Sequence, residues 1–276
     1  MPHPRKQFAQ HWLRSPTALN QIIEAAELSP TDQVLEIGPG TGILTQDLLK
    51  FAQTVVAVEI DRDLCKRLVK KLGNIDNFLL LQGDFLDLDL AALLKDFPKF
   101  KPMNKIVANI PYNITGPILT RLLGTLSSPV VHPYELIVLL IQKEVAQRLC
   151  ATAGAKIFGA LSVRVQYLAE CELICEVPAK AFYPPPKVDS AVVRLRPRPI
   201  ETPAQNPRHL EMLVKLGFAN KRKMLRNNLK SVAEQDQLTP LLEQLKINPQ
   251  ARAEDLGVEQ WVALSDLISA QIPSNV

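Results

Sequence analysis

The chain has 276 residues, of which 47% are hydrophobic, and its formal net charge is +4. This length suffices for one large domain and one small one. No apolar run approaches the roughly 18 residues of a membrane span, and the N-terminus has no hydrophobic signal segment, so we expect a cytoplasmic protein. The four cysteines are scattered and fit neither a zinc-site spacing nor a disulfide framework, so we expect no bound metal.

The charge is distributed unevenly along the chain. Residues 1–179 hold 18 basic and 18 acidic groups, whereas residues 180–230 hold 12 basic and only three acidic groups. Residues 231–276 hold two basic and seven acidic groups. Positive charge confined to one part of a balanced chain is typical of a surface that binds a polyanion. The alternative is a solvated helix face, which a run of charges alone also fits.

The first two thirds of the chain alternate between strand-like and helix-like segments. The short apolar runs are Gln33–Ile37, Thr54–Val58, Phe78–Leu81, Lys105–Ala108 and Leu136–Ile141. The amphipathic stretches between them include Thr41–Phe51, Asp63–Leu72 and Thr115–Leu126. This alternation predicts an α/β fold of the Rossmann-like class, with a mostly parallel sheet covered by helices. Two further runs, Leu173–Val177 and Ala191–Leu195, predict an antiparallel pair at one edge.

A stretch rich in proline, residues 196–207, predicts a linker after this sheet. Beyond the linker, apolar residues recur at helical spacing, and residues 239–272 also predict short helices. We therefore expect two domains. Residues 1–199 would form the sheet-based domain, and residues 200–276 would form a small helical one.

A glycine-rich turn follows the first predicted strand and opens a helix. Gly38, Gly40 and Gly42 have the spacing G-x-G-x-G, in which the third glycine comes one residue earlier than in dinucleotide-binding proteins. This spacing fits a cofactor made of a nucleoside and an amino acid better than one with a pyrophosphate. The turn backbone and the helix N-terminus would approach such a ligand. A tight structural turn is the alternative explanation for the glycines taken alone.

Two acidic residues stand at the ends of the next two predicted strands. Glu59 can accept hydrogen bonds from both hydroxyls of a ribose, and Asp84 can reach an adenine amino group. Together with the glycine turn, these carboxylates predict a nucleoside-binding site. We expect Asp61 to cap a helix, and Glu36 to face solvent or bond to the backbone.

The segment Asn109-Ile110-Pro111-Tyr112 follows the fourth predicted strand. Asn109 Oδ1 and the backbone carbonyl of Ile110 or Pro111 can accept hydrogen bonds from an NH₂ group, and the Tyr112 ring can stack on a flat base. Holding both amine hydrogens in this way would direct the nitrogen lone pair toward a methyl donor. Together with the glycine turn, the segment favours methyl transfer to an adenine nitrogen.

The motifs of this chain resemble those of the ribosomal RNA adenine N6,N6-dimethyltransferase family, and specifically its small-subunit branch. Seven motifs occur in the family's order: Gln10–Leu13, Glu36–Thr45, Val58–Asp61, Gly83-Asp84, Asn109–Ile114, Phe182–Val188 and Phe218–Leu229. The resemblance covers most of the chain. It implies a class I methyltransferase fold with a seven-stranded sheet, and S-adenosyl-L-methionine as the cofactor.

The resemblance also implies roles for individual residues. The implied cofactor contacts are His11, Leu13, Gly38, Gly40, Gly42, Glu59, Asp84 and Asn109, with His11 replacing the family's usual Asn. The implied catalytic set is Asn109, Pro111, Tyr112 and Phe182. In this set Phe182 is the second stacking face for the target base, and Tyr183 is a weaker candidate for that role.

The implied activity is dimethylation of N6 on two adjacent adenosines near the 3′ end of small-subunit (16S) ribosomal RNA during ribosome biogenesis. We expect a monomer that acts on a partly assembled subunit. The RNA phosphates are expected to contact the basic residues Arg194, Arg196, Arg198, Lys221, Arg222, Lys223 and Arg226.

Three alternatives remain open at this point. The first is the large-subunit branch of the same family, whose members confer macrolide-type resistance. Asn113, the run Lys187–Ser190 and the pair Asn227-Asn228 favour the small-subunit branch. The second is a non-catalytic RNA-binding assembly factor, which would be expected to lack the glycine turn or the Asn109 segment. The third, an oxidoreductase that uses NAD, lacks the required glycine spacing.

Overall fold

A computed structural model describes residue 5 and residues 10–131 and 134–271. The chain divides into two compact units. The first contains residues 1–122, 132–146 and 171–197, and the second contains residues 123–131, 147–170 and 198–276. The second unit thus includes two segments that the sequence placed in the first domain. Within the described residues, no helix is long and apolar enough to cross a membrane.

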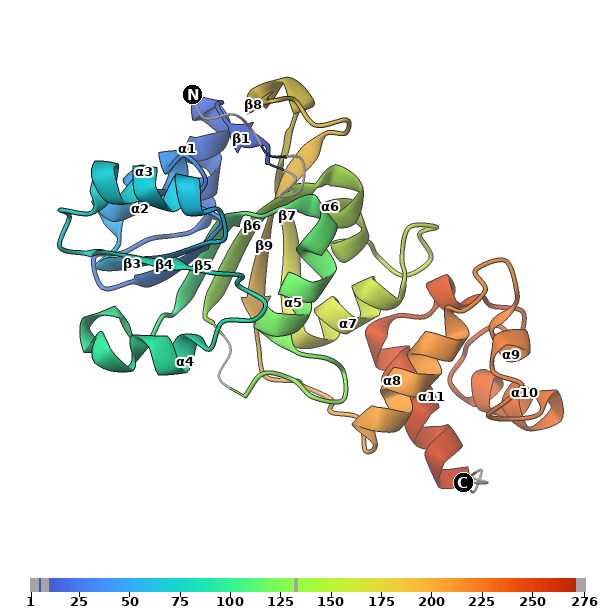
Figure 1. The fold of residues 1–276 in the computed structure, drawn as a ribbon. Coiled ribbons are helices and arrows are strands. Elements are labelled where there is room, and N and C mark those ends of the chain that lie inside the picture. The colour runs from blue at the N-terminus through green and yellow to red at the C-terminus, as the bar shows by residue number, and fades with distance from the viewer. Residues whose placement is uncertain (1–4, 6–9, 132–133, 272–276) are drawn as a thin grey trace. The chain divides into compact units, whose positions relative to one another are not determined.

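The first unit is built on a seven-stranded sheet with the order β4-β3-β2-β5-β6-β9-β7 (Figure 1). Its strands are β2 (Gln33–Ile37), β3 (Thr54–Glu59), β4 (Phe78–Gln82), β5 (Lys105–Asn109), β6 (Leu136–Gln142), β7 (Ala169–Val177) and β9 (Ser190–Pro197). Strands β2 to β6 pair in parallel, and β9 pairs antiparallel to β6. The predicted mostly parallel sheet with an antiparallel edge is confirmed.

The strands are apolar because helices cover the sheet. All six residues of β3 are buried, as are the first six of β6, which is the pattern of strands covered on both faces. One face packs against α1 (Pro16–Ala25), α2 (Ile43–Phe51) and α3 (Arg62–Leu72), and α4 (Leu90–Leu93) lies on the opposite side (Figure 1). The unit also contains α5 (Thr115–Leu123) and the start of α6 (Lys143–Leu149).

The helix boundaries follow local signals in the sequence. Helix α2 begins only at Ile43 because Gly42, at φ 75°, holds a left-handed conformation just before it. Asp61 is the N-cap of α3, as predicted, and its side chain accepts a hydrogen bond from the backbone N–H of Asp63 at 2.9 Å. Helix α5 ends at Leu123, before Gly124 at φ 87°.

Two short strands far apart in the sequence form a second sheet that the sequence did not predict. Strand β1 (Trp12–Leu13) pairs antiparallel with β8 (Phe182–Tyr183). Each has only two residues, which is too short for a periodic pattern to appear. Single-turn 3-10 helices complete the first unit: η2 (Leu94–Asp96), η3 (Pro98–Phe100), η4 (Tyr112–Ile114) and η5 (Ala179–Ala181).

The second unit is helical in its described part. It contains α7 (Ala160–Leu168), α8 (Pro207–Gly217), α9 (Leu225–Asn228), α10 (Gln235–Gln244), η6 (Ala253–Asp255) and α11 (Val258–Gln271). Trp261 is fully buried, and its ring centroid lies 5.6 Å from that of Phe218. Phe158, in the segment of residues 147–170, also contacts Phe218, and the two ring centroids are 6.5 Å apart. This aromatic contact helps explain why residues 147–170 belong to the second unit.

One carboxyl group lies in the interior of the sheet. Glu36 on β2 is 1% exposed, and its Oε2 has no hydrogen-bond partner among the described residues. Burial raises the pKa of Glu36 to about 8; the Thr45 hydroxyl opposes this shift and the charge of Glu59 adds to it. The expectation that Glu36 faces solvent or bonds to the backbone was therefore wrong, because β2 is an inner strand on which Val34 to Ile37 are all buried.

Glu36 should make the stability of the protein depend on pH. Its pKa in the folded state, about 8, lies above the ordinary value of 4.5, so between these values the folded state keeps a proton that the unfolded state releases. The free energy of unfolding should therefore fall as pH rises through this window, by at most about 1.4 kcal/mol per pH unit from this group.

Glu36→Gln should remove this contribution. Urea unfolding of the variant and the wild type at pH 5, 6.5 and 8 checks the prediction, because the variant should gain stability relative to the wild type as pH rises. Parallel pH profiles for the two proteins would contradict it.

Candidate active site

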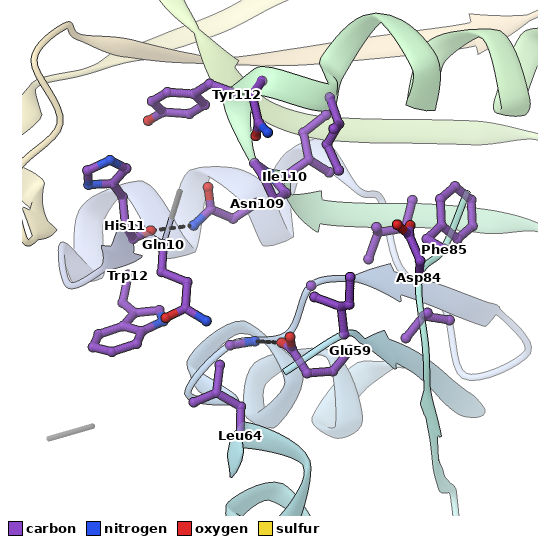
Figure 2. Close-up of a pocket in the computed structure, with 18 of the residues that line it drawn as sticks. Gln10, His11, Trp12, Glu59, Leu64, Asp84, Phe85, Asn109, Ile110 and Tyr112 are labelled. Atoms are coloured by element: carbon purple, nitrogen blue, oxygen red, sulfur yellow. Dashed lines mark hydrogen bonds between the residues drawn. The ribbon is translucent and has the colours of Figure 1, made fainter. Parts of the chain in front are cut away.

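A cavity of about 290 Å³ lies at the carboxyl ends of the parallel strands in the first unit (Figure 2). The glycine turn after β2, Glu59 at the end of β3, Asp84 after β4 and Asn109 at the end of β5 all contribute to it. This edge of a parallel sheet is where open α/β folds bind ligands. The residues that the sequence placed at successive strand ends therefore meet in one place.

Most of the predicted site residues line this cavity. They are His11, Gly38, Gly40, Glu59, Asp84, Asn109, Pro111 and Tyr112. Leu13 and Gly42 do not. Leu13 is 3% exposed and packs in the core, and a Cβ on Gly42 would lie 2.7 Å from Leu68 Cδ2. The structure therefore gives Gly42 a packing role beneath the turn.

Glu59 is the most constrained polar group of the cavity. It is 4% exposed; its Oε2 accepts a hydrogen bond from Gly40 N at 3.0 Å, and its Oε1 accepts one from Asp61 N at 2.9 Å. Burial raises the pKa of this carboxyl, and the two backbone hydrogen bonds oppose the shift. The carboxyl is thus held in one orientation, with remaining lone pairs available to ligand hydroxyls.

Asn109 is oriented by the backbone of His11. Its Nδ2 donates a hydrogen bond to the His11 carbonyl oxygen at 3.2 Å (Figure 2). A carbonyl oxygen can only accept, so this contact assigns the amide nitrogen and leaves Oδ1 as an acceptor without a partner among the described residues. This is the atom that the sequence analysis selected to bind an amine hydrogen.

Tyr112 is fixed from two sides. Its hydroxyl hydrogen-bonds to Ser190 Oγ, and the His11 ring lies nearly parallel to the Tyr112 ring, with centroids 6.0 Å apart and planes 18° apart. His11 Nδ1 is 2.7 Å from the carbonyl oxygen of Pro184, to which it donates because that oxygen is only an acceptor. His11 thereby connects the N-terminal strand, the proline-rich loop and the Tyr112 turn.

Phe182 does not occupy the place that the sequence analysis expected. It does not line the cavity: its side chain is 3% exposed and belongs to the core cluster. An exposed stacking face at Phe182 is therefore absent from this conformation. Tyr183, which was the weaker candidate, is 40% exposed, and the Arg14 guanidinium lies 4.2 Å from the centre of its ring.

Several cavity residues were missed by the sequence analysis. Trp12, Ile60, Leu64 and Phe85 add apolar surface beside Glu59 and Asp84. Apolar walls with a few convergent polar groups are typical of a small-molecule site. Ile60 and Phe85 directly follow the two carboxylates in the sequence, which is a signal that could have identified them.

The basic residues predicted to bind RNA fall into two groups. Arg194 forms ion pairs with Glu27, at 2.6 Å, and with Glu172; Arg196 also pairs with Glu27, and Arg198 pairs with Glu201 at 2.8 Å. These three guanidinium groups already have acidic partners.

The second group belongs to the second unit. Lys221, Arg222 and Lys223 are exposed in the turn between α8 and α9, and Arg226 on α9 is half-buried. Their exposure keeps them available to an external anion. In the described part of the chain, no group of three His, Cys, Asp or Glu residues is placed to hold a metal ion.

Comparison with known proteins places this geometry in a family. The family model described as ribosomal RNA adenine dimethylase matches residues 1–270. A protein of Nostoc sp. named ribosomal RNA small subunit methyltransferase A is 67% identical over 271 residues, covering 98% of this chain and 100% of that protein. The protein of the same name from Rippkaea orientalis is 66% identical, over 97% of this chain and 98% of its own length.

Two solved structures share the fold over nearly the whole chain. A dimethyladenosine transferase from Plasmodium falciparum is 28% identical with a TM-score of 0.75, covering 92% of this chain and 96% of that one. The 23S rRNA methyltransferase ErmE is also 28% identical, with a TM-score of 0.70 and coverage of 94% and 99%. The fold is therefore that of a class I methyltransferase, and the chain belongs to the ribosomal RNA adenine dimethylase family.

Proposed function

We propose that this protein uses S-adenosyl-L-methionine to dimethylate N6 of two adjacent adenosines near the 3′ end of small-subunit ribosomal RNA. The observation that carries the proposal is the cavity that holds Glu59 and Asp84 beside an Asn109 whose Oδ1 is free. Its setting would be ribosome biogenesis in the cytoplasm, with a monomer acting on a partly assembled subunit.

The residues present fit the cofactor. Bound there, it would supply a methyl group on a positively charged sulfur. The buried carboxyl of Glu59 is positioned to accept hydrogen bonds from ribose hydroxyls, and Asp84 to accept one from the adenine amine. Trp12 packs against the glycine turn: a Cβ on Gly40 would lie 3.0 Å from the Trp12 ring, and the φ of 59° at Gly40 also disfavours a side chain there.

The chemistry requires alignment more than a strong base. Asn109 Oδ1 and the carbonyl oxygen of Ile110 or Pro111 would accept the two hydrogens of the target amine, which directs the nitrogen lone pair at the methyl group. These acceptors would hold the amine in place while the bound cofactor supplies its methyl group to the nitrogen. The nitrogen then loses a proton to water. Tyr112 would hold the unstacked base by ring contact.

The choice of ribosomal subunit rests on the relatives. The fold alone does not discriminate, because a 23S rRNA methyltransferase matches it over 94% of the chain. The proteins named small subunit methyltransferase A are far more similar, at 66–67% identity over nearly full length. This difference favours the small subunit.

The substrate assignment is tested by labelled methyl transfer to small and large ribosomal subunits that lack the modification. We expect dimethyladenosine in the 3′ fragment of small-subunit RNA, detected by mass spectrometry after digestion, and little transfer to naked duplex RNA. Modification of large-subunit RNA alone would contradict the substrate assignment, but it would be consistent with the proposed methyl transfer to an adenine amine.

Asn109→Ala should slow methyl transfer far more than it weakens RNA binding. The lost acceptor acts on charge that develops at nitrogen, and a fall of about 100-fold in the single-turnover rate is typical for removal of one such group. Asn74→Ala, which removes an exposed amide that does not line the cavity, is the control and should change the rate much less. Equal rates for Asn109→Ala and the wild type would refute the role.

Glu59→Ala should weaken cofactor binding by roughly 1.5–3 kcal/mol, the range for hydrogen bonds to a charged group. Isothermal titration calorimetry with S-adenosylmethionine measures the change. Asp63→Ala serves as control, since Asp63 is an exposed carboxylate on α3 that does not line the cavity. If a folded Glu59→Ala protein binds as tightly as the control, Glu59 does not hold the ribose.

A further inference from the structure

Helix α3 concentrates positive charge in the first unit. Its eleven residues include five cations and one acid, Asp63, so its net charge of +4 equals that of the entire chain. The cations are Arg62, Lys66, Arg67, Lys70 and Lys71, and all five are exposed. The total charge of residues 1–179 does not reveal this basic helix, because acidic residues elsewhere in that range balance its cations.

The stability of the helix does not explain this arrangement. Three pairs at the i,i+4 spacing carry like charges, namely Arg62–Lys66, Lys66–Lys70 and Arg67–Lys71, and each is destabilising. Arg62 also lies in the first turn, where the helix dipole disfavours a cation. The packing of α3 is provided by its apolar side, Leu64, Cys65, Leu68 and Leu72. Lys70 and Lys71 lie in the last turn, where the dipole favours cations, and Asp63 stands four residues before Arg67, so favourable placements accompany the three like-charged pairs. Helix stability therefore does not account for five cations on one helix.

Nothing within the described part of the chain neutralises these cations. None of the five forms an ion pair there, and Lys71 makes only a long contact of 3.5 Å with the carbonyl oxygen of Thr41. The carboxylate of Asp63 is paired with Arg5 instead. In contrast, Arg194 and Arg196, in the segment with the largest excess of basic residues, have acidic partners.

Helix α3 reaches the rim of the active-site cavity through Leu64, on its apolar side. Leu64 lines that cavity, and it also lines a second hollow of about 200 Å³ whose walls include Arg67 and Lys71. From Leu64 to the end of the helix at Leu72 the axis extends about 12 Å, at 1.5 Å per residue. An RNA whose base enters the cavity would bring its backbone to the cavity rim, to which α3 contributes Leu64.

We propose that the exposed face of α3 is a second phosphate-binding surface for the RNA substrate, in addition to the basic turn at Lys221–Lys223. The inference rests on the proposed function, because it requires a polyanion one of whose bases enters the cavity. RNA is favoured over an acidic protein because a bound base brings its own backbone to this rim. It also explains why the helix retains three like-charged pairs at the i,i+4 spacing.

The test uses two double charge reversals that change net charge equally. Lys66→Glu with Lys70→Glu alters α3. Lys95→Glu with Lys101→Glu alters two exposed lysines that follow α4, a helix on the opposite side of the sheet from α3 (Figure 1). Binding to small subunits lacking the modification is measured at several salt concentrations between about 50 and 200 mM. Calorimetry with S-adenosylmethionine shows that the site is intact in each protein.

The α3 variant should bind more weakly than the control, and its plot of log affinity against log salt should be flatter than that of the wild type by about 1.4, for two lost phosphate contacts. Salt slopes that are equal in the two variants, with cofactor binding intact, would overturn the inference. If the wild type itself does not prefer small subunits over an unrelated RNA of equal length, the proposed function fails instead. If only binding of an acidic ribosomal protein is lost, the surface contacts protein and the inference is wrong.

Discussion

The site depends on the close packing of the turn that joins β2 to α2. Its three glycines adopt φ values of 59° to 75°, which side chains disfavour, and Gly38 N donates to the Val58 carbonyl at 2.9 Å. Glu59 then accepts from Gly40 N, so strand β3 holds the turn from its other side. Gly40 lies against Trp12 of β1, and Gly42 lies against Leu68 of α3. The glycine turn therefore helps to position both β1 and α3.

His11 gives the opposite side of the cavity a similar rigidity. Its backbone orients Asn109, its ring lies beside Tyr112, and its Nδ1 is bonded to the proline-rich loop. An Asn at this position could bond with its side chain but could not present a ring to Tyr112. The replacement in this chain therefore adds an aromatic contact to the wall where the target base is proposed to bind.

The basic side chains of the protein fall into two groups: those that form ion pairs within the protein, and those that remain accessible to an external anion. Arg194 and Arg196 form ion pairs with Glu27 and Glu172 in the first unit. The α3 cations and Lys221–Lys223 have no such partners among the described residues. An exposed ion pair contributes little to stability, but the paired cation is less available to bind a phosphate group. Sequence counts cannot separate the two groups, since ion pairing depends on contacts between distant segments.

The order of strands and helices, the glycine turn and the acids at the strand ends could be predicted from the sequence. Each is a local signal: an apolar run buried on both faces, a residue type that tolerates positive φ, or a polar residue directly after a strand. The family followed from the order of these motifs. The position of Asp61 as a helix cap was equally readable, because capping involves only neighbouring residues.

Only the tertiary structure decided which side chains reach the cavity. Phe182 and Tyr183 are adjacent aromatics in one motif, and the pairing of β8 with β1 places the first in the core and the second at the surface. Glu36 is buried because it lies on an inner strand of the sheet, and Arg194 is neutralised by Glu27, 167 positions away in the chain. These outcomes depend on contacts between segments distant in sequence, which no local pattern encodes.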